Sequence, residues 1–415
     1  MRESIVSRGK VFFREGAEVK RRSAAARMLL ACCACLWQLV MILVVIHPAI
    51  AEEGAASLLK APWHYGAYLD LSYPVDFNYP ESHRWRSKAT TQRVNELTPN
   101  MAMAYVRKDV NESSRWGMEL ALQGGSDPDG QVPQEIPGRD RPLPGAKTLK
   151  HFSRANVSYL SPVGPGVTLT AGLFNSFIGY ESFYARNNFN YTRTYLPDLS
   201  PYFMMGVSAQ YQLADNLQQV LYVVNGYNYL SRPNDLPSYG TRFSLKPSAR
   251  FTLTQNFYYG PDQSNTDLKY WRLFSDSIIE WKHDPVILAL SYDIGTENAA
   301  ELPGSPRTFW TGGALYFWWH IAGPWAAAVR PEFYWDRNGR ITGAEQFIKA
   351  ITTTLEYKLF VASTLARWRL EYRYDDSTGQ QGGFFNGGEV SPGVPGLAQG
   401  QHLLITAILW NYDSP

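Results

Sequence analysis

The chain has 415 residues, of which 18% are charged and 14% aromatic, with 26 Tyr, 20 Phe and 13 Trp. The low charge and high aromatic content argue against intrinsic disorder and against a long charged coiled coil. The length admits one large domain or two of ordinary size. A single segment near the N-terminus is apolar and long enough for a membrane-spanning helix, which excludes a helical membrane protein with several spans.

Residues 1–51 have the organisation of a secretory signal peptide. Basic side chains precede an apolar run over 28–46, and Ala49 and Ala51 then form a small-x-small cleavage site. The main alternative is an uncleaved anchor helix, because the apolar run approaches the roughly 20 residues that span a bilayer. We expect cleavage after the second of these alanines.

Cleavage would leave a short N-terminal segment, 52–63, and a main domain, 64–415, that contains no cysteine. Of the 39 basic and 37 acidic residues, 8 and 3 lie in the signal, so the remainder holds 31 against 34, a net charge of −3. No basic excess is left to neutralise phosphates, which excludes nucleic-acid binding. A lipoprotein signal at Cys32 is a weaker alternative, since Arg27 interrupts the stretch that should already be apolar.

Apolar and polar side chains alternate through the main domain in stretches of about ten residues. In 366–375, for example, Arg369 and Glu371 alternate with Trp368 and Leu370. A period of two residues is typical of β-strands with one apolar and one polar face. The pattern predicts sixteen strands, near 65–73, 100–107, 116–124, 152–160, 167–174, 202–213, 217–225, 239–246, 250–259, 270–282, 286–294, 308–320, 325–335, 346–359, 365–375 and 402–412.

The connections between these strands alternate between long and short. A soluble β-sandwich or propeller has no reason to sort its long loops to one end, and it would expose its charged faces. A transmembrane barrel has short periplasmic turns, long external loops, an apolar lipid-facing band and a polar lumen. We therefore expect an all-β, antiparallel outer-membrane barrel of about 16 strands. The expected long loops are 74–99, 125–151, 175–201, 226–238, 260–269, 295–307, 336–345 and 376–401.

Two stretches test this interpretation. The segment 309–329 is apolar enough for a membrane helix, but Gly323 and Pro324 interrupt it, so we expect two strands joined by a tight turn. Near the C-terminus, Trp410 and Tyr412 lie two residues apart in the last strand. They look like the C-terminal aromatic signal that the barrel-assembly machinery reads, although three further residues follow them.

Several segments resemble the putative OmpL-like porin-2 β-barrel family. They are Gly66-Ala67-Tyr68-Leu69-Asp70-Leu71, the run 172–182, the run 187–195, Asn256-Phe257-Tyr258-Tyr259-Gly260-Pro261, and Arg369-Leu370-Glu371-Tyr372-Arg373-Tyr374-Asp375. The likeness extends over nearly all of the main domain. It implies an outer-membrane porin-like barrel and implies no particular solute.

Motifs for catalysis are absent from the sequence. It has no Gly-x-Ser-x-Gly, His-Glu-x-x-His, Walker or Gly-x-Gly-x-x-Gly pattern, and its histidines have unrelated spacings. We expect neither enzyme activity nor a cofactor or metal. The segments 127–130 and 336–339 are expected to be turns, because neither supplies the spaced oxygens of a calcium loop.

Charged residues of the third long loop are candidates for a pore constriction. A barrel of this size encloses a bore too wide to filter metabolites unless a segment folds inward. In the loop 175–201, Glu181, Arg186, Arg193 and Asp198 would place both charge signs across such a path. The alternative is an external loop that never enters the lumen.

Late strands carry a second set of candidate residues. An arginine facing lipid near the midplane costs about 2 to 4 kcal/mol, so these charged side chains should face the lumen. There they either attract anions or neutralise one another as Arg–Glu pairs across strands. The candidate lumen-wall residues are Arg330, Glu332, Arg367, Arg369, Glu371 and Arg373.

The sequence thus predicts an outer-membrane channel for passive diffusion of small hydrophilic solutes or ions. The expected partners are outer-membrane lipid, the barrel-assembly machinery during biogenesis and the solutes, with a homotrimer left open. One alternative is a lipase-like barrel enzyme; another is a structural or adhesive barrel with a plugged lumen. We also expect a weak anion preference that depends on Arg367 and Arg369.

Overall fold

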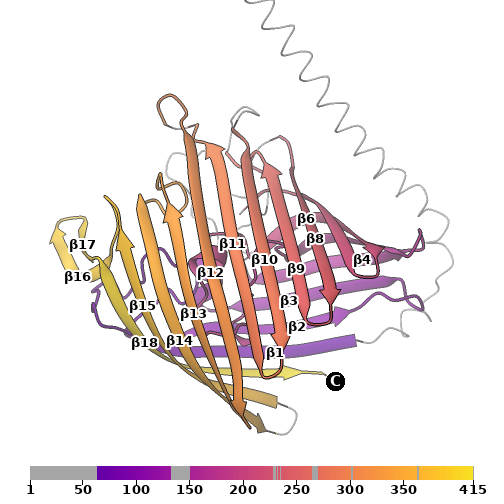
Figure 1. Cartoon of the computed structure of the whole chain (residues 1–415), viewed down its shortest axis with the longest axis horizontal. Helices are drawn as coiled ribbons and strands as arrows, with labels where there is room; N and C mark the ends of the chain where they lie inside the picture. Colours follow the sequence, from indigo (N-terminus) through magenta and orange to yellow (C-terminus); the bar gives the residue numbers. More distant parts are fainter. Residues whose placement is uncertain are drawn as a thin grey trace, which may run out of the picture. The chain divides into compact units, whose positions relative to one another are not determined.

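The computed structural model describes residues 63–131, 150–227, 230, 232–233, 235–263, 270–300, 302–361 and 364–414. The expected signal and its cleavage site lie outside these residues. Sixteen strands close into one antiparallel barrel, in which the first strand pairs with the last (Figure 1). The wall strands are β1 (Trp63–Asp76), β2 (Thr98–Lys108), β3 (Trp116–Gly124), β4 (Phe152–Ser161), β5 (Val167–Asn175), β6 (Phe203–Ala214), β7 (Leu217–Val224), β8 (Ser238–Ser248), β9 (Phe251–Gly260), β10 (Arg272–His283), β11 (Val286–Asn298), β12 (Arg307–Ala322), β13 (Trp325–Asp336), β14 (Gln346–Val361), β15 (Thr364–Thr378) and β18 (Gly400–Asp413).

The sixteen predicted strands are therefore confirmed. One further element, a small hairpin, was not predicted from the sequence. The last long connection carries a further two-stranded hairpin, β16 (Phe384–Ser391) with β17 (Val394–Ala398), which forms a separate small sheet. Four glycines within 384–398 weaken the alternation there, so the hairpin leaves little periodic signal. In Figure 1 it lies at one end of the barrel, beyond β15 and β18.

The barrel is polar inside and apolar outside, as its side-chain alternation predicts. On β1, Tyr68 and Asp70 are buried, whereas Leu69 and Leu71 between them are exposed. An exposed apolar band on a closed barrel is the surface that a bilayer covers, and a polar interior is typical of a pore. No helix among the described residues is long and apolar enough to span a membrane.

The apolar segment 309–329 forms two strands, as expected. β12 and β13 pair antiparallel on either side of Gly323 and Pro324. Gly323 has a φ of +53° and no atom would lie within 4 Å of an added Cβ, so the turn uses the freedom of glycine in open space.

Long connections at one end of the barrel pack inside it. Residues after β1, α2 (Ser126–Gln131) after β3, and the segment after β5 together bury Trp85, Asp127 and Phe183. The expected turn over 127–130 is wrong, since these residues form the α2 helix, and the Asp127 carboxylate accepts a hydrogen bond from Thr91 N at 2.7 Å. These packed loops position the candidate site.

Candidate functional site in the lumen

The segment 176–202, called the inner loop below, lies against the inward side chains of the wall. It contains two short helical turns, η1 (Ala185–Asn187) and α4 (Tyr195–Asp198), and it buries Phe177, Tyr191 and Leu196. Its aromatic residues pack on the wall at several places. The rings of Phe177 and Tyr222 of β7, for example, stack at 4.2 Å.

Carboxylates of the wall hold the backbone of the inner loop. Glu371 on β15 accepts hydrogen bonds from Tyr191 N at 2.6 Å and from Thr192 N at 3.0 Å. Glu332 on β13 accepts one from Tyr195 N at 2.7 Å. Hydrogen bonds from backbone N–H groups to carboxylates are about twice as strong as neutral ones. The inward carboxylates therefore act as anchors for the loop.

Arginines of the wall hold the carbonyl groups of the same loop. Arg369 donates to the carbonyl oxygens of Ala185, Asn188 and Asn190 at 2.8, 2.7 and 3.0 Å. Arg330 donates to Thr192 O at 2.5 Å, and it also forms an ion pair of 2.7 Å with Glu181. Side chains from two strands, β13 and β15, thus fix one loop along its length.

The four candidate constriction residues do not form one ring. Arg193 forms an ion pair with Asp127 of α2 at 3.2 Å, and both side chains are fully buried. Asp198 pairs with Lys88 of the first long connection and accepts a 2.8 Å hydrogen bond from Thr90. Arg186 instead pairs at 3.2 Å with Asp413, at the opposite end of the lumen.

Glu181, the fourth of these residues, faces Arg330 and also accepts hydrogen bonds from Thr194. Glu181, Arg193 and Asp198 are therefore buried in ion pairs between the loops and the wall, and Arg186 is the most exposed of the four. Their role in selecting solutes stays a prediction.

The candidate lumen-wall residues all point inward, and most are paired. Arg373 forms ion pairs of 2.8 Å with both Glu332 and Asp375, and Arg369 lies 2.6 Å from Glu356. These are cross-strand and same-strand Arg–carboxylate pairs in which the charges compensate each other. Arg367 differs, because it is part-exposed and donates to the neutral Asn411 at 2.8 Å.

We call the inward faces of β13, β14, β15, β18 and β1 the packed wall, since the inner loop covers them. The opposite side of the lumen is different. Tyr222 faces Phe177 of the inner loop, and its register partner Ser208 starts an inward row on β6 that continues through Gln210 and Gln212. Gln210 is exposed and the other two are part-exposed. Polar side chains on this side thus line the part of the lumen that water can reach.

The same register identifies the inward residues of β8 and β10. A Cβ on Gly240 would meet Phe177 at 2.1 Å, so Gly240 faces the inner loop and Arg242 and Lys246 share its face. Glu280 accepts a 2.7 Å hydrogen bond from Tyr180 of the inner loop, which places Lys282 on the same inward face.

We call this accessible side of the lumen the open wall, and the sequence analysis did not select any of its residues. The alternation in 239–246 and 270–282 could have assigned Arg242, Lys246 and Lys282 to the polar face. The open wall comprises Ser208, Gln210, Gln212, Gln218, Arg242, Ser244, Lys246, Thr252, Glu280 and Lys282.

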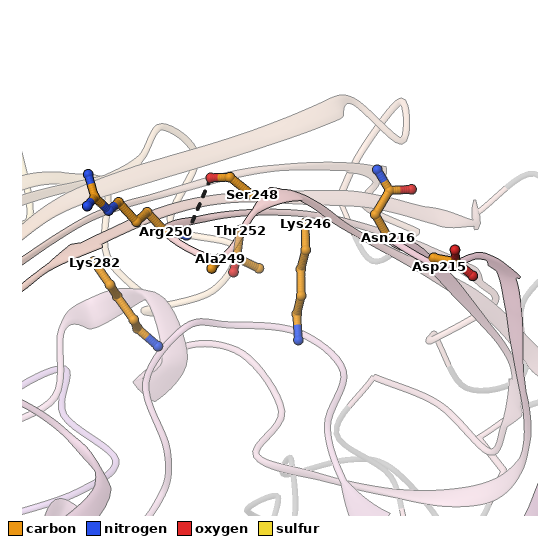
Figure 2. A pocket seen from close by; sticks show the side chains of 8 residues that line it. All are labelled: Asp215, Asn216, Lys246, Ser248, Ala249, Arg250, Thr252 and Lys282. Atoms are coloured by element: carbon orange, nitrogen blue, oxygen red, sulfur yellow. Dashed lines mark hydrogen bonds between the residues drawn. The ribbon is translucent and has the colours of Figure 1, made fainter.

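A cavity of about 370 Å³ lies where the open wall meets the short turns (Figure 2). Its lining includes Lys246, Thr252 and Lys282 from the strands and Asp215 from the β6–β7 turn. Groups of three or more potential metal ligands are not found among the residues that the structure describes.

Burial shifts one titration in the loop cluster. It raises the pKa of Asp127 from the ordinary aspartate value to about 7, and Arg193 offsets only part of this effect. The α2 helix and the inner loop are therefore joined by a carboxyl group that titrates near neutral pH.

The comparisons with known proteins agree with this geometry. A family model described as "Putative beta-barrel porin-2, OmpL-like" matches residues 62–410. No curated protein matches the chain significantly.

Among solved structures, the outer-membrane channel DcaP of Acinetobacter baumannii has a TM-score of 0.51 at 8% identity, covering 85% of this chain and 97% of its own. The anion-selective porin from Comamonas acidovorans has a TM-score of 0.51 at 8% identity, covering 86% and 100%. OmpF of Salmonella typhi, in complex with daunomycin, has a TM-score of 0.51 at 10% identity, covering 87% and 100%. These three likenesses concern the fold. The chain belongs to the OmpL-like β-barrel porin-2 family, and it is a porin-like barrel of the outer membrane.

Proposed function

We propose that small hydrophilic solutes diffuse passively between the inner loop and the open wall. The observation that carries this proposal is the difference in exposure between the two sides of the lumen. Arg330 and Arg373 of the packed wall are 0% exposed, whereas inward Gln210, Ser208 and Arg242 remain accessible. A row of accessible amide, hydroxyl and guanidinium groups suits hydrated solutes and offers no apolar pocket.

A plugged structural barrel is the second candidate, and one observation favours it. The first long connection packs on the inner loop, because Lys88 donates to Arg193 O at 2.6 Å and Thr90 to Asp198. The same connection reaches the last one, since Arg86 donates to Gly383 O at 2.6 Å. These contacts narrow the end of the lumen that carries the long loops.

Single-channel recording of the purified barrel in planar bilayers distinguishes the two. The diffusion proposal expects steady open steps from protein that shows heat-modifiable mobility on gels, the usual sign of a folded barrel. Folded protein that never conducts would contradict the proposal and leave the plugged barrel. Liposome swelling with uncharged sugars of increasing size would then give the width of the path.

We propose that transport involves no chemical change of the solute. The lipase-like alternative requires a serine, a histidine and an acid that meet at the outer rim. Acyl-ester hydrolysis by the folded protein would support that alternative.

We also propose three features of processing and assembly. The signal is cleaved before residue 52, the assembly machinery recognises Trp410 and Tyr412, and the barrel forms a homotrimer. The mobility of the unheated protein on gels tests the homotrimer, and the N-terminal sequence of the mature protein tests the cleavage site.

A further inference from the structure

Three basic side chains follow the open wall from the short-turn rim into the lumen. Lys246 and Arg242 lie four residues apart on β8, and Lys282 lies near the end of β10. β9 pairs with both strands and separates them, so the two strands lie about 10 Å apart. The three charges thus border one stretch of the path.

The positive charge of this row is only partly compensated. The open wall has one carboxylate, Glu280, which lies 2.8 Å from Lys282 and also accepts the Tyr180 hydroxyl. Among the described residues, no carboxylate lies within 4.0 Å of Arg242 or Lys246. Two further carboxylates lie nearby: exposed Asp215 lines the same rim cavity, and Asp276, fully buried on β10, interacts electrostatically with Arg242. At accessible positions three cations therefore face two anions, Glu280 and Asp215, an excess of one positive charge.

The packed wall shows the opposite arrangement. Its arginines Arg330, Arg369 and Arg373 each lie within 2.8 Å of a carboxylate oxygen and are covered by the inner loop. A permeating ion would meet these groups only as neutral pairs behind the loop, because opposite charges at such distances cancel beyond a few ångströms. Apart from Arg367 on β15, the uncompensated positive charge in the lumen therefore lies on the open wall.

The rim gives these lysines room to meet a solute. Lys246 and Lys282 line the cavity of about 370 Å³, together with the hydroxyl of Thr252. Figure 2 shows both lysine side chains extending to the same side of the sheet, while Arg250 extends to the other. This volume holds several waters or a small hydrated anion beside two ammonium groups.

We infer that Arg242, Lys246 and Lys282 make the channel prefer small anions, with the lysine pair as the entry site at the short-turn rim. This inference rests on the proposed diffusion path along the open wall. A row of fixed cations raises the local concentration of anions and lowers that of cations, as rings of Lys or Arg do in anion pores.

The test replaces all three residues by glutamine in the full-length barrel and measures the reversal potential in a KCl gradient. The wild-type barrel is expected to pass chloride more readily than potassium. In the triple variant the chloride-to-potassium permeability ratio should fall by about two-fold or more. The change should be larger at 0.1 M than at 1 M salt, because the screening length shortens from about 10 Å to about 3 Å.

Arg307→Gln is the matched control, since Arg307 is an exposed cation at the long-loop end of β12 and does not line the cavity. It should leave the permeability ratio unchanged. A triple variant that conducts with the wild-type ratio would overturn the anion inference and leave the diffusion proposal intact. A wild-type barrel that is folded but electrically silent would overturn the diffusion proposal itself. Heat-modifiable mobility of each variant confirms that it is folded.

Discussion

The two sides of the lumen use the same residue types for different purposes. On the packed wall, Arg369 and Glu371 bind backbone groups of the inner loop and are buried. On the open wall, Arg242 and Lys246 stand in accessible positions, and no carboxylate among the described residues lies within 4.0 Å of either. A charge in a barrel lumen therefore does not by itself indicate a selectivity residue. Its role depends on whether a loop covers the side chain and takes up its hydrogen bonds.

Removing an anchor of the packed wall should have the largest effect. Glu371→Ala leaves Tyr191 N and Thr192 N without their acceptor, at a cost of about 1 to 3 kcal/mol for each unsatisfied buried donor. The inner loop should then leave the wall for part of the time. We expect the mean single-channel conductance to rise at least about two-fold, with more current noise.

Glu345→Ala is a control for that variant, because Glu345 lies exposed between β13 and β14. It should conduct like the wild type. If Glu371→Ala also keeps the wild-type conductance and noise, the anchoring role of the packed wall is wrong.

Narrowing the open wall should reduce the conductance. Ser208→Trp adds a large side chain at an inward position of β6, whereas Val207→Trp adds the same side chain to the lipid-facing side next to it. We expect the first variant to lose roughly half of the single-channel conductance and the second to lose little. Equal conductance of the two variants would show that the solute path does not run along β6.

Arg367 and Arg369 separate selectivity from anchoring within one strand. Arg367→Glu alters a part-exposed charge next to Asn411, so it should lower the chloride preference slightly and leave the conductance intact. Arg369→Glu removes three hydrogen bonds to loop carbonyls and should instead raise the conductance. Reversal potentials and step sizes measured on both variants decide between these roles. Matching results for the two substitutions would contradict the distinction.

The smallest effect should come from Asp127. The pKa of its carboxyl is about 7 in the folded barrel, above the value near 4 of an unfolded chain. Its contribution to stability is therefore full below about pH 4 and is lost as the pH rises through 7. Asp127→Asn should flatten the dependence of the unfolding temperature on pH between 5 and 8, as followed by heat-modifiable mobility. A slope identical to that of the wild type would contradict this assignment.

The barrel was predictable from the sequence because its signal is local. Alternation at a period of two residues located each wall strand and put Arg369 and Glu371 on the inward face. Their partners were not predictable, because Glu371 and Thr192 are 179 residues apart and no local pattern links them. The hairpin β16–β17 was not predicted for a different reason: its alternation is weak, so it gives no periodic signal.

The inner loop also contacts both the first and the last strand of the barrel wall. It contacts the first strand through the hydrogen bond from Tyr191 to Asp70, at 2.8 Å, and the last strand through the ion pair of Arg186 with Asp413. β1 and β18 form the seam at which the barrel closes. Docking the loop brings both sides of this seam to one surface and so reduces the chain entropy lost on closure. The contacts that anchor the inner loop therefore also link the two strands at which the barrel closes.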